Sequence, residues 1–341
     1  MAMPQNNRNM KKIYWIAALI FLLCIVWLLG PKPNTPHYIN ILPQVPPAEQ
    51  IDGYISELEK SHQIKPENEA KVEWFEDSSG RITEYSIVYL HGFSSSREEG
   101  APVHRNLAKK FGCNLFLSRL AEHGIDTTEQ LMGLTPENYW ESAVKALAIG
   151  KSIGKKVILM GTSTGATQAL QLAASFPNEV AGLILYSPNI EINDPNAWLL
   201  NEHWGLQIAR MVKQSDYNDP PDPRPIYKKY WNKPYRLESL VALQEMLETT
   251  MKKEQFEKVN QPLLMLYYYS DEQHQDPVVR VDAMKKMFGQ ISTPSNLKKQ
   301  VALPLTGDHV IASPIKSKDV AGVERETIEF MSQIMKLPTI H

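Results

Sequence analysis

The sequence predicts an α/β protein with a mostly parallel central sheet that is covered by helices on both faces. Two observations predict this fold class. From about residue 82 onward, short runs rich in apolar and β-branched residues alternate with segments of helical periodicity. The runs "SIVYL", "KVILM" and "GLILY" are almost entirely apolar, which is typical of strands that are buried on both faces. A chain of 341 residues is long enough for a sizeable core.

The N-terminal stretch predicts a membrane anchor. No charged residue occurs between Ile13 and Gly30, and a helix over 13–30 is about long enough to cross a hydrocarbon core. Arg8, Lys11 and Lys12 precede it, so residues 1–12 are expected to stay in the cytoplasm. The rest of the chain would then be extracytoplasmic, which means periplasmic if the source is bacterial.

A cleaved signal peptide is the main alternative to an anchor. The apolar run ends in "VWLLGPKP", which has no A-x-A-like cleavage site, and so an uncleaved anchor is preferred. Lipidation of Cys24 is a further alternative, although no small residues precede this cysteine. With Cys113 as the only other cysteine, the folded part has no disulfide framework.

Residues 31–50, "PKPNTPHYINILPQVPPAEQ", are rich in proline and are expected to form an extended spacer that lifts the domain off the membrane. Ile51, Tyr54, Ile55 and Leu58 then recur at helical spacing and predict a short opening helix. The β-rich runs "KVEWFED" and "ITEYSIVYLHGF" are separated by "SSGR", which favours a hairpin.

The alternating elements follow in order along the chain. Helices are expected over "HRNLAKKF", "ENYWESAVKALAIGKSI", "GATQALQLAASF", "DAMKKMFGQ" and "DVAGVERETIEFMSQIMK". Strands are expected over "NLFLSRL", "KVILM", "VAGLILYSP", "QPLLMLYYYS" and "KQVALPL". The predicted core therefore comprises residues 51–188 and 262–341.

Residues 189–261 interrupt this alternation and predict a helical cap. The segment has no clear strand, and it contains the proline-rich run "DPPDPRP". Its aromatic residues either form an acyl-binding pocket or simply pack, and the sequence does not separate the two possibilities: Trp198, Trp204, Tyr217, Tyr227, Tyr230, Trp231 and Tyr235.

Ser163 lies in "GTSTG", which fits G-x-S-x-G and stands between a predicted strand and a predicted helix. In a sharp strand-to-helix turn, side chains two positions before and after the serine have no room, so glycines occupy both places. The hydroxyl is then exposed at a helix N-terminus, where free N–H groups favour negative charge. A serine helix cap is the alternative, but the position between strand and helix favours a nucleophile.

A serine nucleophile needs a histidine base and an acid that orients it, and these follow the serine in the order acid, then histidine. Of the later histidines, His203 falls in the cap, His274 in the candidate acid loop and His341 at the end of the chain. His309, in the loop "LPLTGDHVIAS" after the last predicted strand, is the expected base.

The loop "YYYSDEQHQDPVVRV" offers the acid. Asp276 is preferred because it leads into the next helix, and Asp271 is its rival because it lies nearer the strand end; Glu272 belongs to the same loop. Asp308 is expected to be solvated. The backbone N–H groups of Phe93, in "YLHGFSSS", and of Thr164 are expected to form an oxyanion hole, with His91 as a scaffold residue.

On the segments "HGF" and "GTSTG", the chain resembles serine hydrolases of the α/β-hydrolase fold from about Val72 to Lys336. The resemblance implies Ser163 as nucleophile, His309 as base, Asp276 as acid, and a helical cap between the sixth and seventh strands of the usual eight. It also implies hydrolysis of carboxylic esters, with acyl or lipid esters favoured by the anchor.

Several functions and partners remain open or are set aside. A peptidase or a thioesterase would use the same residues, and a tethered binding module without activity is the alternative of another class. The mechanism needs no metal or organic cofactor. A formal net charge of −2 argues against nucleic acid as a partner, and the sequence does not give the oligomeric state.

Overall fold

A central sheet of seven strands organises the chain in the computed structural model, which describes residues 5–340. The strand order is β1-β3-β2-β4-β5-β8-β9, and all neighbours are parallel except β1, which is antiparallel to β3. The predicted fold class is confirmed, with one strand fewer than the eight implied by the resemblance. Residues 1–4 of the expected cytoplasmic segment, and His341, lie outside the described residues. The strands are β1 (Lys71–Glu73), β2 (Thr83–Leu90), β3 (Asn114–Leu117), β4 (Gly154–Thr162), β5 (Val180–Tyr186), β8 (Leu263–Tyr267) and β9 (Lys298–Ala302).

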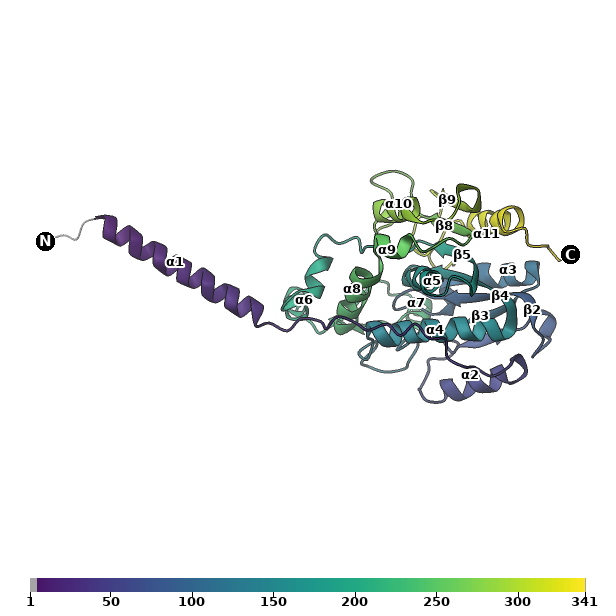
Figure 1. Ribbon diagram of the computed structural model, residues 1–341. Helices are drawn as coiled ribbons and strands as arrows, with labels where there is room; N and C mark the ends of the chain where they lie inside the picture. The colour runs from purple at the N-terminus through teal and green to yellow at the C-terminus, as the bar shows by residue number, and fades with distance from the viewer. Residues whose placement is uncertain (1–4, 341) are drawn as a thin grey trace.

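Helices cover both faces of this sheet (Figure 1). Alternate residues of a strand point to opposite faces, so Val157 and Leu159 of β4 join one apolar cluster, while Ile158 and Met160 join the other. The first cluster packs under α2, α4, α5, α8 and α10, and the second packs under α3 and α11. These helices are α2 (Ile51–Glu59), α3 (Val103–Phe111), α4 (Pro136–Ile153), α5 (Thr164–Ser175), α8 (Glu238–Thr250), α10 (Val281–Gln290) and α11 (Val320–Glu329), the last continued by a π-helical turn, Phe330–Ile334.

The expected hairpin between the first two β-rich runs is wrong. Strand β1 pairs with β3, with Val72 opposite Phe116, whereas β2 lies between β3 and β4. The cause is burial: residues 86–90 of β2 are all buried, so this strand takes a central place. The short β1, with only its middle residue buried, suits the edge of the sheet.

The N-terminal helix α1 (Gln5–Leu28) projects from one end of the domain (Figure 1). Its stretch Met10–Leu28 has a mean hydropathy of 2.0, and none of that stretch is buried. This helix is therefore long and apolar enough to cross a membrane, or to serve as a signal sequence.

The segment after α1 does not hold the domain at a distance, contrary to the expected spacer. The indole Nε1–H of Trp140 donates to the Ile39 carbonyl oxygen (3.0 Å), and the Tyr38 hydroxyl is hydrogen-bonded to Thr249 Oγ1 (2.8 Å). Leu42 and Val45 pack against the core. Proline makes this segment extended, but its apolar side chains bring it down onto α4 and α8.

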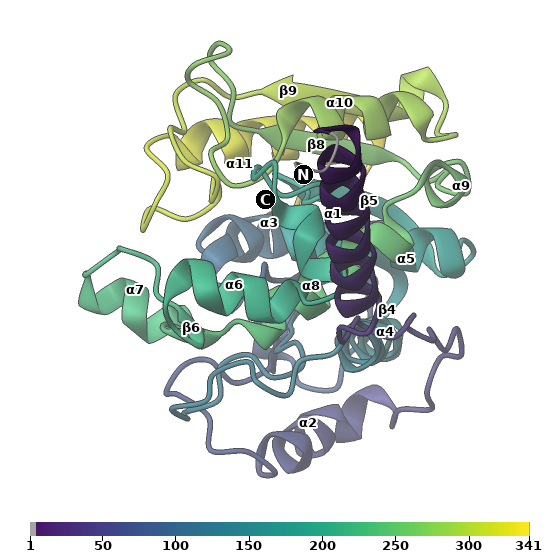
Figure 2. The same ribbon diagram turned by 90° about the vertical axis from the view of Figure 1, so that its left-hand side faces the viewer.

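The segment between β5 and β8 forms a mostly helical layer that lies beside the base of α1 (Figure 2). The expectation of a cap without strands is wrong in one detail, because β6 and β7 form a small antiparallel pair. The segment contains a 3₁₀ helix (Ala197–Asn201), α6 (Gly205–Lys213), β6 (Tyr217–Asn218), α7 (Pro225–Tyr230), β7 (Tyr235–Arg236), α8 and α9 (Lys253–Phe256).

Candidate active site

Ser163 occupies a single-residue turn between β4, which ends at Thr162, and α5, which begins at Thr164. Its backbone has φ 54° and ψ −119°, a conformation that non-glycine residues rarely adopt and that costs about 1–3 kcal/mol. The Ser163 N–H donates to the Tyr186 carbonyl oxygen of the next strand, over 2.8 Å. The serine is thus held at the carboxyl end of the sheet, where ligand sites of parallel sheets occur.

The two glycines of "GTSTG" make this turn sterically possible. A Cβ on Gly165 would overlap the Leu90 carbonyl oxygen, and a Cβ on Gly161 would overlap the backbone of Gly165. Backbone atoms on both sides leave no room for a side chain to move away. The glycine spacing that singled out Ser163 in the sequence is therefore a packing requirement of the turn.

His309 and Asp276 are in contact in the structure. His309 Nδ1 lies 2.7 Å from Asp276 Oδ2, and the other oxygen, Oδ1, accepts from the N–H groups of Val278 (2.9 Å) and Val279 (3.0 Å). Burial disfavours the charged imidazolium, but the Asp276 carboxylate outweighs it and raises the pKa of His309 above its usual value. The ring nitrogen Nε2 has no hydrogen-bond partner among residues 5–340.

The rival residues lie elsewhere. Asp271 is more than half exposed and is paired with His274, whose Nδ1 is 2.8 Å from its Oδ1. His203 contacts the end of α1, where its Nδ1–H donates to the Gly30 carbonyl oxygen (2.7 Å). Of the candidate acids in this loop, Asp276 is the one that contacts His309 in the described part of the chain.

Ser163 and His309 line one pocket of about 310 Å³. Three cap aromatics, Tyr227, Trp231 and Tyr235, contribute to its wall, whereas Tyr230 is hydrogen-bonded to Glu67 outside it. The cap aromatics thus divide between lining a pocket and packing. The lining consists of Phe93, Ser94, Glu99, Ser163, Thr164, Asn189, Ile192, Pro220, Tyr227, Trp231, Tyr235, Leu240, Leu243, Val278, Asp308, His309, Val310 and Lys316.

The loop after β2 leaves the Phe93 N–H unbonded while it uses the N–H groups on either side. The Gly92 N–H donates to Glu99 Oε2 (2.6 Å), and the Ser94 N–H donates to His123 Nε2 (3.0 Å). In the described part of the chain, no backbone carbonyl oxygen of a turn or loop accepts a hydrogen bond from the N–H of Phe93 or of Thr164. Both residues line the pocket beside Ser163.

Two histidines hold this loop. His91 donates from Nδ1 to the Gly92 carbonyl oxygen (2.9 Å), and its Nε2 accepts from the Leu120 N–H (3.0 Å). Burial lowers the pKa of His91 to about 4, so its ring is neutral at physiological pH. His91 therefore has the scaffold role expected from the sequence. Burial also lowers the pKa of His123.

Glu99 and His123 were not identified from the sequence. Glu99 is 2% exposed and lines the pocket, and burial raises its pKa to about 7. A Cβ added to Gly92 would lie 2.9 Å from Glu99 Oε2 and 3.1 Å from Ser163 Cβ, so the side chains of Glu99 and Ser163 both pack against Gly92. In the sequence, "SREEG" is typical of an exposed charged turn, so only the fold reveals this carboxyl group.

Comparisons with known proteins agree with this architecture. Residues 141–303 match the family model described as "Serine aminopeptidase, S33". No match is found among curated proteins. The matched family segment runs from within α4 to just past β9, and so it includes Ser163 and Asp276.

Three solved structures similar to this chain have low sequence identity to it. A structure from work on LipS and LipT, two metagenome-derived lipolytic enzymes, has a TM-score of 0.63 at 16% identity, over 80% of this chain and 100% of that one. The monoacylglycerol lipase of Paleococcus ferrophilus has a TM-score of 0.55 at 12% identity, over 79% and 100%. Est1E from Butyrivibrio proteoclasticus, with bound ferulic acid, has a TM-score of 0.50 at 16% identity, over 77% and 95%.

Identities this low establish the fold alone. In this chain, the parallel sheet, the sharp turn after β4 and the segment inserted after β5 follow one another as the sequence predicted. Taken with the family match, they identify the fold of the chain as the α/β-hydrolase fold.

Proposed function

We propose that this α/β-hydrolase is a membrane-anchored serine hydrolase that cleaves carboxylic esters. The observation that carries the proposal is the contact of His309 Nδ1 with Asp276 Oδ2, 2.7 Å long, because His309 lines the same pocket as Ser163 in its strained turn. With Nδ1 committed to the carboxylate, His309 keeps Nε2 free to take a proton.

In the first half of the reaction, Ser163 Oγ attacks the ester carbonyl carbon while His309 Nε2 takes the hydroxyl proton. The carbonyl oxygen becomes an oxyanion, and the N–H groups of Phe93 and Thr164 donate to it. Asp276 stabilises the imidazolium. Collapse of the tetrahedral intermediate breaks the ester C–O bond, and His309 returns the proton to the departing alkoxide.

In the second half, water replaces the alcohol. His309 Nε2 takes a proton from the water as its oxygen attacks the acyl-enzyme carbonyl. The second tetrahedral intermediate releases the carboxylic acid and restores Ser163 with its proton. The same side chains and the same two backbone donors serve both halves.

An acyl or lipid ester is the favoured substrate class. The pocket wall contains aliphatic and aromatic side chains, among them Leu243, Val278 and Trp231, on which the apolar part of a substrate can pack. Two of the similar structures are of enzymes described as lipolytic and as a monoacylglycerol lipase. The basic flank of α1 supports a cytoplasmic N-terminus, with the catalytic domain on the other side of the membrane.

A fluorophosphonate probe tests the nucleophile directly. The folded wild-type protein should become covalently labelled, and Ser163→Ala should not be labelled. Removal of the serine should lower ester turnover by roughly 10⁴-fold or more, with little effect on unfolding. A folded wild-type protein that resists the probe and hydrolyses no ester would leave the non-catalytic binding module as the better description.

A peptidase is the second candidate, because the matched family model is described as a serine aminopeptidase. A panel that pairs one acyl group with an ester, a thioester and an anilide leaving group separates the three activities. The proposal expects the largest kcat/KM for the ester, and a larger kcat/KM for aminoacyl anilides would assign the peptidase instead.

A further inference from the structure

The end of α1 is hydrogen-bonded to the cap rather than free. The N–H of Trp204 donates to the Pro31 carbonyl oxygen (2.9 Å), and its indole Nε1–H donates to the Val26 carbonyl oxygen (2.9 Å). Next to it, His203 donates to Gly30, and Lys32 pairs with Glu202 at 3.1 Å. The loop before α6 is therefore fixed at the point where the apolar helix ends.

Helix α6 begins at Gly205, directly after Trp204, and it presents apolar side chains to solvent. Met211 is 71% exposed and Val212 is 72% exposed, which is unusual for neighbouring apolar residues on a helix of a folded domain. Lys213 follows them and is also exposed. Both views show α6 running across the direction of α1, at the end of the domain from which α1 projects (Figures 1 and 2).

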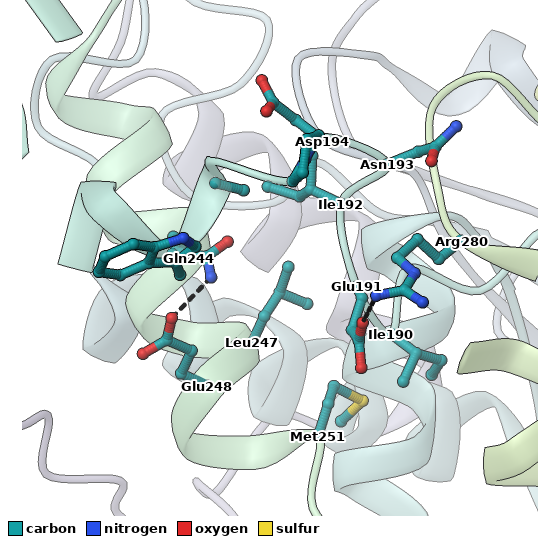
Figure 3. Close-up of a pocket in the computed structure, with 13 residues that line it drawn as sticks. Ile190, Glu191, Ile192, Asn193, Asp194, Gln244, Leu247, Glu248, Met251 and Arg280 are labelled. Atoms are coloured by element: carbon teal, nitrogen blue, oxygen red, sulfur yellow. Dashed lines mark hydrogen bonds and ion pairs between the residues drawn. The ribbon is translucent and has the colours of Figure 1, made fainter. Parts of the chain in front are cut away.

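A second pocket, of about 530 Å³, lies behind this end of the cap (Figure 3). Leu247, Met251 and Ile190 give it an apolar floor, and the ion pair of Glu191 with Arg280, 3.0 Å long, lies on one side. Trp198, 53% exposed, belongs to its lining and comes from the 3₁₀ helix just before the loop that contacts α1.

The second pocket adjoins the catalytic pocket, and Ile192 forms part of the wall of both. The catalytic pocket alone, at about 310 Å³, is smaller than the second. A long hydrocarbon chain esterified at the reacting carbonyl needs more room than the catalytic pocket offers, and the second pocket is the adjoining space. The chain would lie along its apolar residues, and the polar part of its lining would face away from the chain: Glu191, Asn193, Asp194, Gln244, Glu248 and Arg280.

We propose that the outer face of α6 docks on the lipid bilayer that α1 enters, and that the second pocket receives the hydrocarbon chain of an ester lipid taken from that bilayer. This inference rests on the proposed function, because it assumes an anchored ester hydrolase. The bilayer is the occupant that the chain itself specifies: α1 ends within hydrogen-bonding distance of the loop that starts α6.

The dimensions agree with docking. Nine residues at helical rise make α6 about 14 Å long, so its whole length stays near the boundary where α1 leaves the hydrocarbon. A helix that lies in the interface inserts apolar side chains to a depth of roughly 5–10 Å and keeps basic side chains at the headgroups. Met211 and Val212 are the apolar side chains that would insert, and Lys213 is the basic side chain that would stay at the headgroups.

Depth-dependent quenching tests the docking. In a Cys24→Ser background, Met211→Cys is labelled with a nitrobenzoxadiazole fluorophore in the full chain, reconstituted in phosphatidylcholine vesicles that carry spin-labelled lipid. Ile82→Cys is the matched control, because Ile82 is 49% exposed and precedes β2 at the amino ends of the parallel strands, opposite to the edge of the sheet at which Ser163 lies. The proposal expects the spin-labelled lipid to quench the fluorophore at position 211 and not the one at position 82. If the spin-labelled lipid leaves the fluorescence at position 211 as unchanged as that at position 82, the docking is overturned.

Turnover separates this inference from the proposed function. Wild type and the double variant Met211→Glu, Val212→Glu are compared on soluble umbelliferyl butyrate and on umbelliferyl oleate in phosphatidylcholine vesicles. The variant should lower the ratio of oleate to butyrate turnover on the order of tenfold, because two charges replace the inserted side chains. Ile82→Glu should leave the ratio unchanged. No turnover of butyrate by wild type defeats the proposed function, whereas normal butyrate turnover with an unchanged ratio defeats only the docking.

The second pocket has its own test. Met251→Trp places a larger side chain in the pocket from a partly buried position. In detergent micelles, where docking plays no part, it should lower kcat/KM for the oleate ester relative to the butyrate ester, by about tenfold for several displaced methylene groups. An unchanged chain-length preference in a variant whose circular dichroism matches wild type would exclude the pocket as the chain site.

Discussion

Glu99 Oε2 accepts a hydrogen bond from the Gly92 N–H, 2.6 Å away, on the wall of the pocket that holds Ser163. The carboxyl group thus fixes the residue before Phe93, whose N–H remains available. A buried acid beside a developing oxyanion is favourable only when it is uncharged, and burial raises the pKa of Glu99 to about 7.

The titration of Glu99 should be visible in stability. Because the folded pKa is above the ordinary value of 4.5, the folded protein holds this proton more tightly than the unfolded chain. The contribution is fully present below pH 4.5 and is lost as the pH rises through about 7. The free energy of unfolding of wild type, relative to Glu99→Gln, should therefore fall over this window, on the order of 3 kcal/mol. Chemical denaturation in detergent at pH 5 and pH 8 measures it, and a constant difference would contradict it.

Asp276→Asn should abolish most of the activity, while Asp271→Asn should not. The first substitution removes the carboxylate that holds His309 Nδ1 and should lower kcat about 10⁴-fold. The second removes an exposed pairing with His274 and should change kcat less than about twofold. Steady-state hydrolysis of a soluble ester checks both variants. The reverse ranking would make Asp271 the acid.

The acid limb of the pH profile should lie above the ordinary histidine pKa. His309 must be neutral to take the serine proton, and the Asp276 carboxylate raises its pKa above 6.5 despite the opposing effect of burial. The midpoint at which kcat/KM rises with pH should therefore exceed 6.5. Asp271→Asn is the control and should leave the midpoint in place. A wild-type midpoint below 6.5 would mean that the carboxylate does not govern this histidine.

Gly165→Ala should destabilise the protein severely. Its methyl group would overlap the Leu90 carbonyl oxygen, and backbone on both sides cannot move aside as a flexible side chain could. The expected loss in the free energy of unfolding is more than about 3 kcal/mol. Gly289→Ala is the matched control, because a Cβ there has nothing within 4 Å and the residue lies inside α10, where alanine is favoured. Equal stability of the two variants would refute the argument.

Local patterns were sufficient to predict the parallel strands of the sheet, most of the helices that cover it and the turn at Ser163. Strand β4 is a short apolar run, helix α5 follows it with helical spacing, and the two glycines predict the sharp turn between them. His309 followed from its place after the last strand. The choice between Asp276 and Asp271 depends on which carboxylate turns inward, and this is decided by the N–H groups of residues 278 and 279, which no local pattern reveals.

The remaining features depend on contacts between distant parts of the chain. The hairpin was wrong because a turn signal shows that the chain reverses, but not which strands pair. Glu99 and His123 become important only when two loops converge on Phe93. The proline-rich segment was expected to be a spacer because its composition indicates an extended backbone, whereas Tyr38 and Ile39 find their partners on α8 and α4.

Those contacts along residues 31–47 restrict the way in which the domain can move. With hydrogen bonds at Pro31, Tyr38 and Ile39, the catalytic domain cannot pivot about a loose tether and keeps one heading relative to α1. In the proposed anchored enzyme, the active site would therefore meet substrate by lateral diffusion in the leaflet beneath it and not by free rotation in solution. The proposal then predicts that the rate follows the surface density of substrate rather than the bulk concentration.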